Sequence, residues 1–531
     1  MNFVSLAFLL FLVITFILYY AIPKKWQWII LLIASMVFYI WAGWIYAIYL
    51  LASIIVTYSA ALGIEKLNDL CAASIDGKEK EERKSIKKSF ENKKGWVLAA
   101  GIVVNITILV VVKYLDFILT SAVSIINLLG GDVQNSALNI VLPLGLSFYT
   151  FQSLGYCIDV KRGTIKAQKN LFKYALFVSF FPQLLQGPIG RYDRLAPQLF
   201  EEHKIEYNNV FLGTQRIILG FFKKLAVADV VGIFVDAIFS SPTNAYGFVG
   251  ALGAIGYAVQ LFADFSGFMD IAIGSAKLFG ITLDENFNSP YLSTTVAGYW
   301  RRWHISLGAF FRDYIYYPIL RGKVCTKLLK NKNKKLGSNL ATAIALLTTW
   351  LLIGLWHGAS WNYVLHGLYY GVIITLGILL EPAYKIVREK LKLKAENAYF
   401  KCFQVLRTLI IVCFGYILFR TQTLTEFGNY ISAMFSGSGI NEITHFDEVF
   451  GLNMELEWLY VVEIILTTII WIVVSHNMNN LKTVDIDGDG VSVWKKMAMF
   501  NCVVMIAIAI VAYVMVNSLG GVSGGFIYYS F

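Results

Sequence analysis

The sequence predicts an all-α polytopic membrane protein, folded as a single transmembrane domain over residues 1–531. Hydrophobic residues make up 57% of the chain and charged residues 15%, whereas an ordinary soluble domain has about 25% charged residues. The mean hydropathy is +0.62. Apolar runs of about 20 residues, the length that spans a bilayer, recur throughout, and we expect about 11 crossings. The apolar residues 458–531 should supply the last helices.

The first apolar run, NFVSLAFLLFLVITFILYYAIPKK, is typical of a retained membrane helix. A signal peptide begins with basic residues and ends at an A-x-A cleavage site, and this run has neither feature. The run is also longer than the apolar core of a signal peptide. We therefore expect the first helix to remain in the mature chain.

The distribution of Lys and Arg predicts which loops face the cytoplasm, because cytoplasmic loops carry the excess of these residues. Basic residues gather in residues 65–95, 161–170, 321–335 and 385–394. We interpret each stretch as a solvated cytoplasmic loop rather than as a nucleic-acid site. Residues 421–457 contain no Lys or Arg and should be extracytoplasmic, as should both chain termini.

Two segments are expected to depart from regular membrane-spanning helices. In FFPQLLQGPIGRYDRL, residues 180–195, Pro182, Gly187 and Pro188 interrupt any helix. Broken backbone is tolerated at membrane depth only where it is buried in protein or lines a cavity, so this segment should be re-entrant. Residues 286–318 are too polar to span lipid, and they predict an amphipathic or re-entrant helix near the cytoplasmic face.

A metal site has little support in the sequence. The six cysteines form no CxxC pair and the six histidines show no HExxH spacing, so reduced, packed thiols are the expected state. DIDGDG, residues 485–490, matches the start of a calcium-binding EF-hand loop. Its twelfth position should be a bidentate Glu but is Lys496, so we interpret it as a polar turn.

The stretch GLWHGASWNYVLHG, residues 354–367, places two histidines in an apolar region. Ionisable side chains inside a membrane are costly and usually functional, although a histidine held by hydrogen bonds between helices is an open alternative. On one regular helix His357 and His366 would lie about 180° apart and could not share a site. Gly354 and Gly358 flank His357 and permit close approach or a local break. His357 is therefore the expected functional imidazole.

Six motifs in this order resemble the bacterial membrane-bound O-acyltransferases, most closely their alginate O-acetyltransferase branch. The motifs are SFYTFQSLGYCIDVKRG, FFPQLLQGPIGRY, FADFSGFMDIAIG, NFNSPYL, YWRRWHISLGAFFRDYIYYP and GLWHGASWNYV. They lie in a core at residues 142–371, and the similarity continues through FGYILFRTQTLTEFGNYISAMF to the C-terminal FIYYSF. The resemblance therefore covers nearly the whole chain.

The resemblance implies a ring of helices around a thin centre that a transmembrane tunnel crosses. It implies that His357, in the W-H-G motif, is catalytic, and that His304, in R-W-H-x-S, is a second functional residue toward the cytoplasmic mouth. Polar and tryptophan side chains of the same motifs are the candidates for lining the substrate and donor tunnel: Gln183, Gln186, Asp264, Ser266, Asn288, Arg301, Arg302, Trp303, Trp356 and Asn362.

The resemblance also implies transfer of an acyl group, in the first place acetyl, from a cytoplasmic thioester to an extracytoplasmic cell-envelope polysaccharide or exopolysaccharide. The expected donor is acetyl-CoA or an acyl carrier protein, with no permanently bound cofactor. The expected partner is an extracytoplasmic esterase-like protein of the SGNH type. The chemistry agrees, because imidazole suits proton removal near neutral pH. Basic loops would also attract an acidic donor.

Two alternatives remain open from the sequence. One is D-alanyl transfer to teichoic acid from a carrier protein, and the other is a transporter without chemistry. The chain also departs from the usual family pattern: ILRGKVC replaces a glycine-rich LGG turn, His366 stands where Trp or Tyr is usual, and Tyr370 stands where His is common. These departures leave His357 in place but leave the acceptor open.

Overall fold

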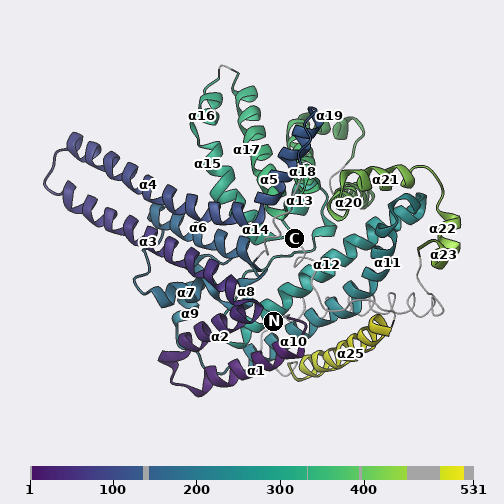
Figure 1. Cartoon of the computed structure of the whole chain (residues 1–531), viewed down its shortest axis with the longest axis horizontal. Helices are drawn as coiled ribbons and strands as arrows, with labels where there is room; N and C mark the ends of the chain where they lie inside the picture. Colours follow the sequence, from purple (N-terminus) through teal and green to yellow (C-terminus); the bar gives the residue numbers. More distant parts are fainter. Residues whose placement is uncertain (1–2, 135–142, 332, 394–396, 451–490, 519–531) are drawn as a thin grey trace.

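The computed structural model describes residues 3–134, 143–331, 333–393, 397–450 and 491–518. In these residues the fold is helical and contains no strand, and an isolated antiparallel bridge joins Phe287 to Trp303. Seven described helices are long and apolar enough to cross a membrane, and three shorter apolar helices accompany them (Figure 1). The all-α, multi-pass prediction is confirmed. The DIDGDG turn and much of the expected C-terminal region lie outside the described residues.

The N-terminal helices include a long hairpin that projects from the rest of the molecule (Figure 1). α3 and α4 contain 32 and 34 residues, which corresponds to about 50 Å each at about 1.5 Å per residue. The hydrocarbon core is only about 30 Å thick, so the hairpin must reach beyond it. The bounds of this group are α1 (Leu6–Ala21), η1 (Lys24–Trp26), α2 (Gln27–Ala42), α3 (Trp44–Ile75), α4 (Lys80–Lys113) and α5 (Leu115–Leu128).

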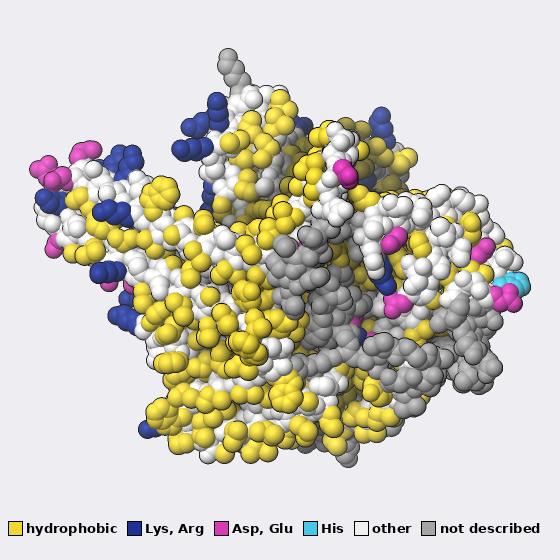
Figure 2. Space-filling view, viewed as in Figure 1, with side chains coloured by type: hydrophobic (Ala, Val, Ile, Leu, Met, Phe, Trp, Pro, Cys, Tyr) yellow, Lys and Arg dark blue, Asp and Glu magenta, His cyan; other side chains and the backbone are white. Residues whose placement is uncertain are grey.

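The expectation of a loop at residues 65–95 was wrong, since only residues 76–79 lie between α3 and α4. Opposite charges spaced three or four residues apart favour helix, and Lys78–Glu82 and Glu91–Lys94 form such ion pairs. The charged tip of the hairpin still carries the basic residues that motivated the prediction. Figure 2 shows Lys and Arg gathered at this tip and again over α15–α17.

The next segment is broken into short helices, as its Pro and Gly residues predicted. Their bounds are α6 (Leu146–Arg162), α7 (Leu171–Ser179), α8 (Phe181–Leu184) and α9 (Tyr192–Phe200). The backbone between them is buried and finds side-chain partners. The Phe181 N–H donates to Ser35 Oγ at 3.1 Å, and the Ile189 N–H donates to Ser306 Oγ at 3.0 Å. Irregular backbone is therefore satisfied inside the protein, as membrane depth requires.

A pair of helices in close contact forms the centre of the fold. α10 (Tyr207–Phe222) continues through a π-helical turn, η2 (Lys223–Ala228), into α11 (Asp229–Ser240), and η3 (Pro242–Asn244) leads to α12 (Gly247–Leu278). A Cβ added at Gly220 would lie 2.5 Å from the Gly267 carbonyl oxygen. Gly213 and Gly274 make an equivalent contact, seven residues before Gly220 on α10 and seven residues after Gly267 on α12. Glycines thus let the two backbones approach more closely than larger residues would.

The remaining described helices surround this centre and complete the chain. Their bounds are η4 (Pro290–Leu292), α13 (Val296–Trp300), α14 (Ile305–Phe311), η5 (Arg312–Tyr316), α15 (Tyr317–Leu320), α16 (Lys323–Leu329), α17 (Lys334–His357), α18 (Trp361–Leu379), α19 (Glu381–Lys390), α20 (Ala398–Arg420), α21 (Leu424–Met434), α22 (Ile440–Thr444), α23 (Phe446–Phe450) and α25 (Val491–Ser518).

Residues 286–318 form short helices rather than one amphipathic helix, so that expectation was wrong in part. Trp303 and His304 are buried, each 2% exposed, whereas a surface helix would leave them at an interface. The backbone at His304 has a φ of 48°, which interrupts the helix before α14. The Asn286 carbonyl accepts the Ile305 N–H at 3.0 Å, which ties the interruption to the interior.

The contact between α10 and α12 makes a direct prediction about stability. Gly220→Ala places a Cβ against backbone that cannot move away cheaply, and it should lower the free energy of unfolding in detergent by about 1–3 kcal/mol. Gly377→Ala in α18 is the matched control, because a Cβ there meets no atom within 4 Å. Thermal unfolding measures both. A Gly220→Ala protein as stable as the Gly377→Ala protein would contradict this packing.

Candidate active site

Three histidines from separate parts of the chain meet in the buried interior. His304 precedes α14, His357 ends α17 and His366 lies in α18, and their exposed fractions are 2%, 4% and 1%. The ring centres of His357 and His366 are 5.9 Å apart. The Trp356 ring contacts both His357, at 4.8 Å, and His304, at 5.7 Å. The imidazoles thus share one aromatic cluster.

The expectation that His357 and His366 face opposite sides was wrong, because they do not lie on one helix. α17 ends at His357, and the chain reverses through residues 358–360. The Ser360 Oγ then accepts the Asn362 N–H at 3.3 Å and caps the start of α18. The two helices return alongside each other, so residues nine apart in sequence face one another.

Glycines allow this hairpin to close tightly. A Cβ at Gly354 would lie 2.3 Å from the Tyr363 carbonyl oxygen, and a Cβ at Gly367 would lie 2.9 Å from the Gly354 Cα. A Cβ at Gly358 would meet the Tyr363 ring at 2.3 Å. Each glycine therefore serves close approach, and together they bring the imidazoles of α17 and α18 into contact.

His304 reaches the same cluster through an unusual backbone conformation. Its φ of 48° lies in the left-handed region, which non-glycine residues adopt uncommonly. The Asn286 Oδ1 accepts the Ser306 N–H at 2.9 Å and helps to hold the turn. The rings of Phe265 and His304 pack edge to face, with their centres 4.8 Å apart. The structure thus joins His304 to the other two histidines, which the sequence did not predict.

Two further aromatic side chains, which the sequence did not predict to be site residues, complete the walls. Phe419 of α20 lies 5.1 Å from His357 and 5.0 Å from His366, ring centre to ring centre. Tyr370 of α18 lies 4.9 Å from His366. No sequence signal distinguishes Phe419 from the other phenylalanines of an apolar helix. Only the packing of α20 against the hairpin identifies it.

Several polar atoms in this cluster are buried without a hydrogen bond to the described residues. They include both ring nitrogens of His304 and of His366, and the indole nitrogens of Trp300 and Trp356. Leaving one buried polar group unsatisfied costs about 1–3 kcal/mol. A concentration of such groups in one place is typical of a site whose partner is a ligand. This cluster is therefore the candidate active site.

A small polar pocket adjoins the cluster. Phe151 lines the pocket, stacks on Phe310 at 4.6 Å and lies 6.3 Å from the Trp356 ring. Arg191 and Asp159 stand among its other lining residues. The cavity volume is about 10 Å³, room for about one water. A small pocket with polar lining residues thus lies close to the aromatic cluster of the histidines.

Gln183 and Gln186, both predicted to line the tunnel, lie in the broken segment between α7 and α9. Gln183 Nε2 donates to the Phe177 carbonyl at 3.2 Å, a carbonyl that Gln152 of the small pocket also contacts, at 2.6 Å. The side-chain oxygens of Gln183 and Gln186 are buried without a hydrogen bond to the described residues. The shared Phe177 carbonyl places Gln183 near the pocket rather than in the imidazole cluster.

Asp264 and Ser266 lie in the buried part of α12. The Asp264 carboxylate pairs with Lys224 at 2.8 Å, and Lys224 also pairs with Asp229 at 2.7 Å. This network links α12 to η2 and α11. Ser266 is 3% exposed and its hydroxyl has no hydrogen bond to the described residues. Asp264 therefore has a clear structural role in joining helices.

The other predicted tunnel residues are spread over several places. Arg301 and Arg302 are exposed, and the Asn288 N–H donates to the Arg302 carbonyl at 3.0 Å. Trp303 is buried and packs on Phe287 at 5.0 Å. Asn362 Nδ2 donates to the Thr421 carbonyl at 2.7 Å and so ties α18 to the end of α20. Among the ten candidates, Trp356 contacts two of the imidazoles, those of His357 and His304.

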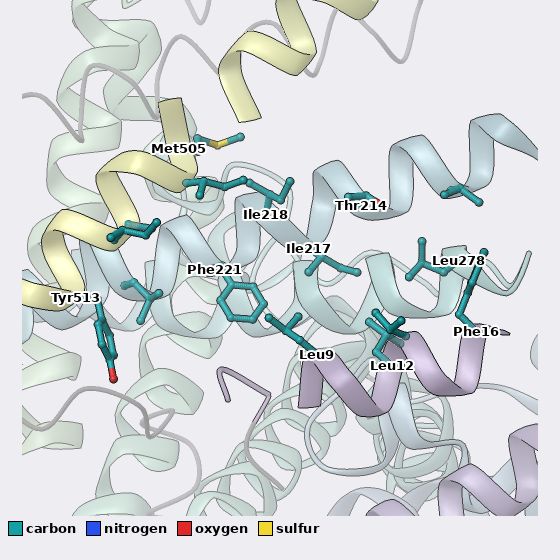
Figure 3. A pocket seen from close by; sticks show the side chains of 16 residues that line it. Leu9, Leu12, Phe16, Thr214, Ile217, Ile218, Phe221, Leu278, Met505 and Tyr513 are labelled. Atoms are coloured by element: carbon teal, nitrogen blue, oxygen red, sulfur yellow. The ribbon is translucent and has the colours of Figure 1, made fainter. Parts of the chain in front are cut away.

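A separate groove is too apolar to be the reaction site. It has a volume of about 620 Å³ and lies between α1, α10 and α25 (Figure 3). Its lining includes Leu12, Ile217, Phe221 and Met505, and Thr214 is one of its few polar members. Within the described residues, no group of three or more His, Cys, Asp or Glu side chains is placed to hold a metal ion. The imidazole cluster therefore remains the best candidate.

Comparison with known proteins identifies the family of the chain. A family model described as the membrane-bound O-acyltransferase family matches residues 165–419, which contain all three clustered histidines. A protein named probable alginate O-acetylase, from Pseudomonas aeruginosa, is 33% identical over 441 residues, covering 82% of this chain and 75% of that protein.

Two further relatives carry other acceptors in their names. A peptidoglycan O-acetyltransferase of Helicobacter pylori is 29% identical and covers 79% of this chain and 75% of its own. A teichoic acid D-alanyltransferase of Bacillus subtilis is 29% identical but covers 53% of this chain and 69% of its own. The alignments with the O-acetyltransferases thus extend over more of the chain.

The ion-pair network gives a test of the role of Asp264. Lys224→Met leaves the carboxylates of Asp264 and Asp229 buried without their shared cation, so it should destabilise the protein by about 3–5 kcal/mol. Arg194→Met breaks an exposed pair with Asp284 and should cost about 0–1 kcal/mol. Denaturation in detergent compares them. Equal stability of the two variants would show that the buried network is dispensable.

Proposed function

The chain belongs to the membrane-bound O-acyltransferase family and is an O-acyltransferase, and from this premise we propose the direction and chemistry of the transfer. It takes an acyl group, in the first place acetyl, from a cytoplasmic thioester donor. It passes that group through a tunnel to a hydroxyl of an extracytoplasmic cell-envelope polysaccharide or exopolysaccharide. The observation that carries the proposal is the cluster of three buried imidazoles walled by aromatic rings.

His357 acts as the general base in the proposed reaction. The acceptor oxygen attacks the thioester carbonyl carbon, and its proton passes to the His357 imidazole as the new O–C bond forms. The C–S bond then breaks, and the leaving sulfur takes the proton from His357. General-base help of this kind contributes about 10² to 10⁴ in rate.

The neighbours of His357 provide the remaining requirements. The indole N–H groups of Trp356 and Trp300 have no hydrogen bond to the described residues and are suited to the negative oxygen of the tetrahedral intermediate. His366 faces His357 and helps to hold the acceptor hydroxyl. His304, on the other side of Trp356, orients the donor. The aromatic walls exclude water, which would otherwise hydrolyse the thioester.

The donor is proposed to approach the cluster from the side of the polar pocket beside Phe151 and Phe310, which has room for about one water and would have to open. Arg191 lines the pocket and Arg162 lies over the Tyr314 ring, but Arg191 is paired with Asp313 and Arg162 with Asp159. The proposal of an acidic donor rests instead on the basic residues gathered at the tip of the α3–α4 hairpin and over α15–α17, which would attract either the phosphates of acetyl-CoA or an acidic acyl carrier protein. Neither donor is a permanently bound cofactor.

The acceptor side is proposed to work with a partner. An extracytoplasmic esterase-like protein of the SGNH type would accept the acyl group and complete its transfer to the polysaccharide. The longer alignment with O-acetyltransferases, 82% of the chain against 53% for a D-alanyltransferase, supports O-acetylation over alanyl transfer. A transporter without chemistry would not need three buried imidazoles in one cluster.

Substitution of the histidines tests the proposed chemistry. His357→Gln keeps the size of the side chain but removes the base, so acylation should fall by about 10² or more. His366→Gln should also reduce acylation, because the two side chains share one site. Mass spectrometry of envelope polysaccharides from cells that carry each variant measures the effect, at matched protein level.

His445→Gln is the control, since His445 is exposed at the end of α22. It should acylate as the unaltered protein does. Normal acylation by His357→Gln would exclude it as the base, and normal acylation by His366→Gln would limit the site to His357 and His304.

The proposed orientation has its own test. Single cysteines at Ser74, near the tip of the α3–α4 hairpin, and at Ser438, before α22, should be labelled from opposite sides of the membrane. A membrane-impermeant maleimide applied to intact cells should label Ser438→Cys only, because residues 421–457 are proposed to be extracytoplasmic and residues 65–95 cytoplasmic. Labelling of Ser74→Cys alone would reverse the orientation and with it the direction of transfer.

A further inference from the structure

We propose that Lys113 and Tyr114, at the junction of α4 and α5, are positioning residues that hold His357 in its reactive place. The inference rests on the proposed function, because the geometry that these residues fix matters for the proton transfer assigned to His357. It concerns a part of the chain that neither the histidine motifs nor the predicted tunnel residues include.

The contacts join this junction to the last turn of α17. The Lys113 Nζ donates to the Trp356 carbonyl at 2.8 Å and lies 3.5 Å from the His357 carbonyl. The Tyr114 hydroxyl donates to the Leu355 carbonyl at 2.6 Å. Two neighbouring side chains of one helix end thus contact three successive carbonyls of another.

These three carbonyls need partners from outside their own helix. The last carbonyls of any α-helix have no intrahelical N–H to accept from, and a glycine in the left-handed conformation often supplies the remedy. Gly358 instead is extended, with a φ of −179°. Lys113 and Tyr114 provide the donors that this missing turn would have supplied.

The charge of Lys113 also suits its position. A cation at a helix C-terminus is stabilising, and more so where it is partly buried, because the negative ends of the carbonyl dipoles point toward it. Lys113 forms no ion pair with a carboxylate among the described residues. A lysine in the apolar run ILVVVKYLDF is costly unless it meets such a need. Here the need is that of the C-terminal end of α17, which carries His357 and whose carbonyls lack donors from their own helix.

The same junction braces the other side of the hairpin turn. Phe117 of α5 packs edge-on against Trp361, the first residue of α18, at 5.6 Å. Residues 355–361 are therefore held from both ends by α4 and α5. A displacement of about 1 Å in a reacting group can cost about 10² in rate, so this bracing bears on catalysis as well as on stability.

The test compares Lys113→Met, Lys113→Arg and Lys94→Met. Lys94 is the matched control: it is buried in the same helix and donates to Asn68 Oδ1 at 2.9 Å, and among the described residues it forms no hydrogen bond or ion pair with α17. Each protein is purified in detergent and assayed with acetyl-CoA, or with an acylated carrier protein if acetyl-CoA gives no transfer. Hydrogen exchange by mass spectrometry follows residues 355–361 in the same samples.

Lys113→Met should lower kcat by about tenfold to a hundredfold, with KM for the donor little changed, because the donor pocket is elsewhere. Exchange in residues 355–361 should become faster. Lys113→Arg should restore most of kcat, since a guanidinium keeps the charge and the N–H donors. Lys94→Met should match the unaltered protein in kcat and in exchange at residues 355–361.

Three results would overturn the inference: unchanged exchange at residues 355–361 in Lys113→Met, a loss of kcat that Lys113→Arg does not restore, or an equal loss in Lys94→Met. Failure of the proposed function looks different. In that case the unaltered protein transfers no acyl group from either donor, while the effect of Lys113→Met on hydrogen exchange remains.

Discussion

The hydrocarbon core of a membrane contains no water, so polar groups at that depth must find hydrogen-bond partners within the protein. This constraint governs the structure. The broken backbone between α7 and α9 is satisfied by serine hydroxyls, such as that of Ser35, from neighbouring segments. Lys224 finds two carboxylates in the ion-pair network around η2. The end of α17 is satisfied by Lys113 and Tyr114. The fold meets this need at these places, although other buried atoms outside the cluster, such as the Ser266 hydroxyl and the Gln183 side-chain oxygen, also lack a hydrogen bond to the described residues.

The imidazole cluster stands out against that background. His304, His366, Trp300 and Trp356 keep buried nitrogens without a hydrogen bond to the described residues. A gathering of such groups in one place is typical of a site whose partner is a ligand. The energetic cost of leaving them unsatisfied is consistent with a site that binds a polar substrate in an apolar setting. Family membership shows that the chain is an O-acyltransferase, and we propose this cluster as the place of that chemistry.

Close helix packing sets the geometry of the cluster. The hairpin of α17 and α18 closes because Gly354 and Gly367 place backbone against backbone; Gly354 lies three residues before His357, and Gly367 directly follows His366. α20 then covers the open side with Phe419. Small residues at helix contacts are how membrane proteins obtain such rigidity without a water-driven hydrophobic effect. The positions of the imidazoles are therefore a property of three helices together.

The sequence by itself determined the all-α membrane class and the broken segment around Pro182, and it made His357 the candidate functional imidazole. Composition, helix-breaking residues and motif order are local properties, so they can be read without coordinates. Only the tertiary structure decided that His366 faces His357, because glycines such as Gly354 and Gly358 occur both inside helices and at turns. It also decided that Lys113 reaches Trp356. That contact joins residues 243 positions apart, and hydrophobic periodicity carries no information about which helix ends will meet.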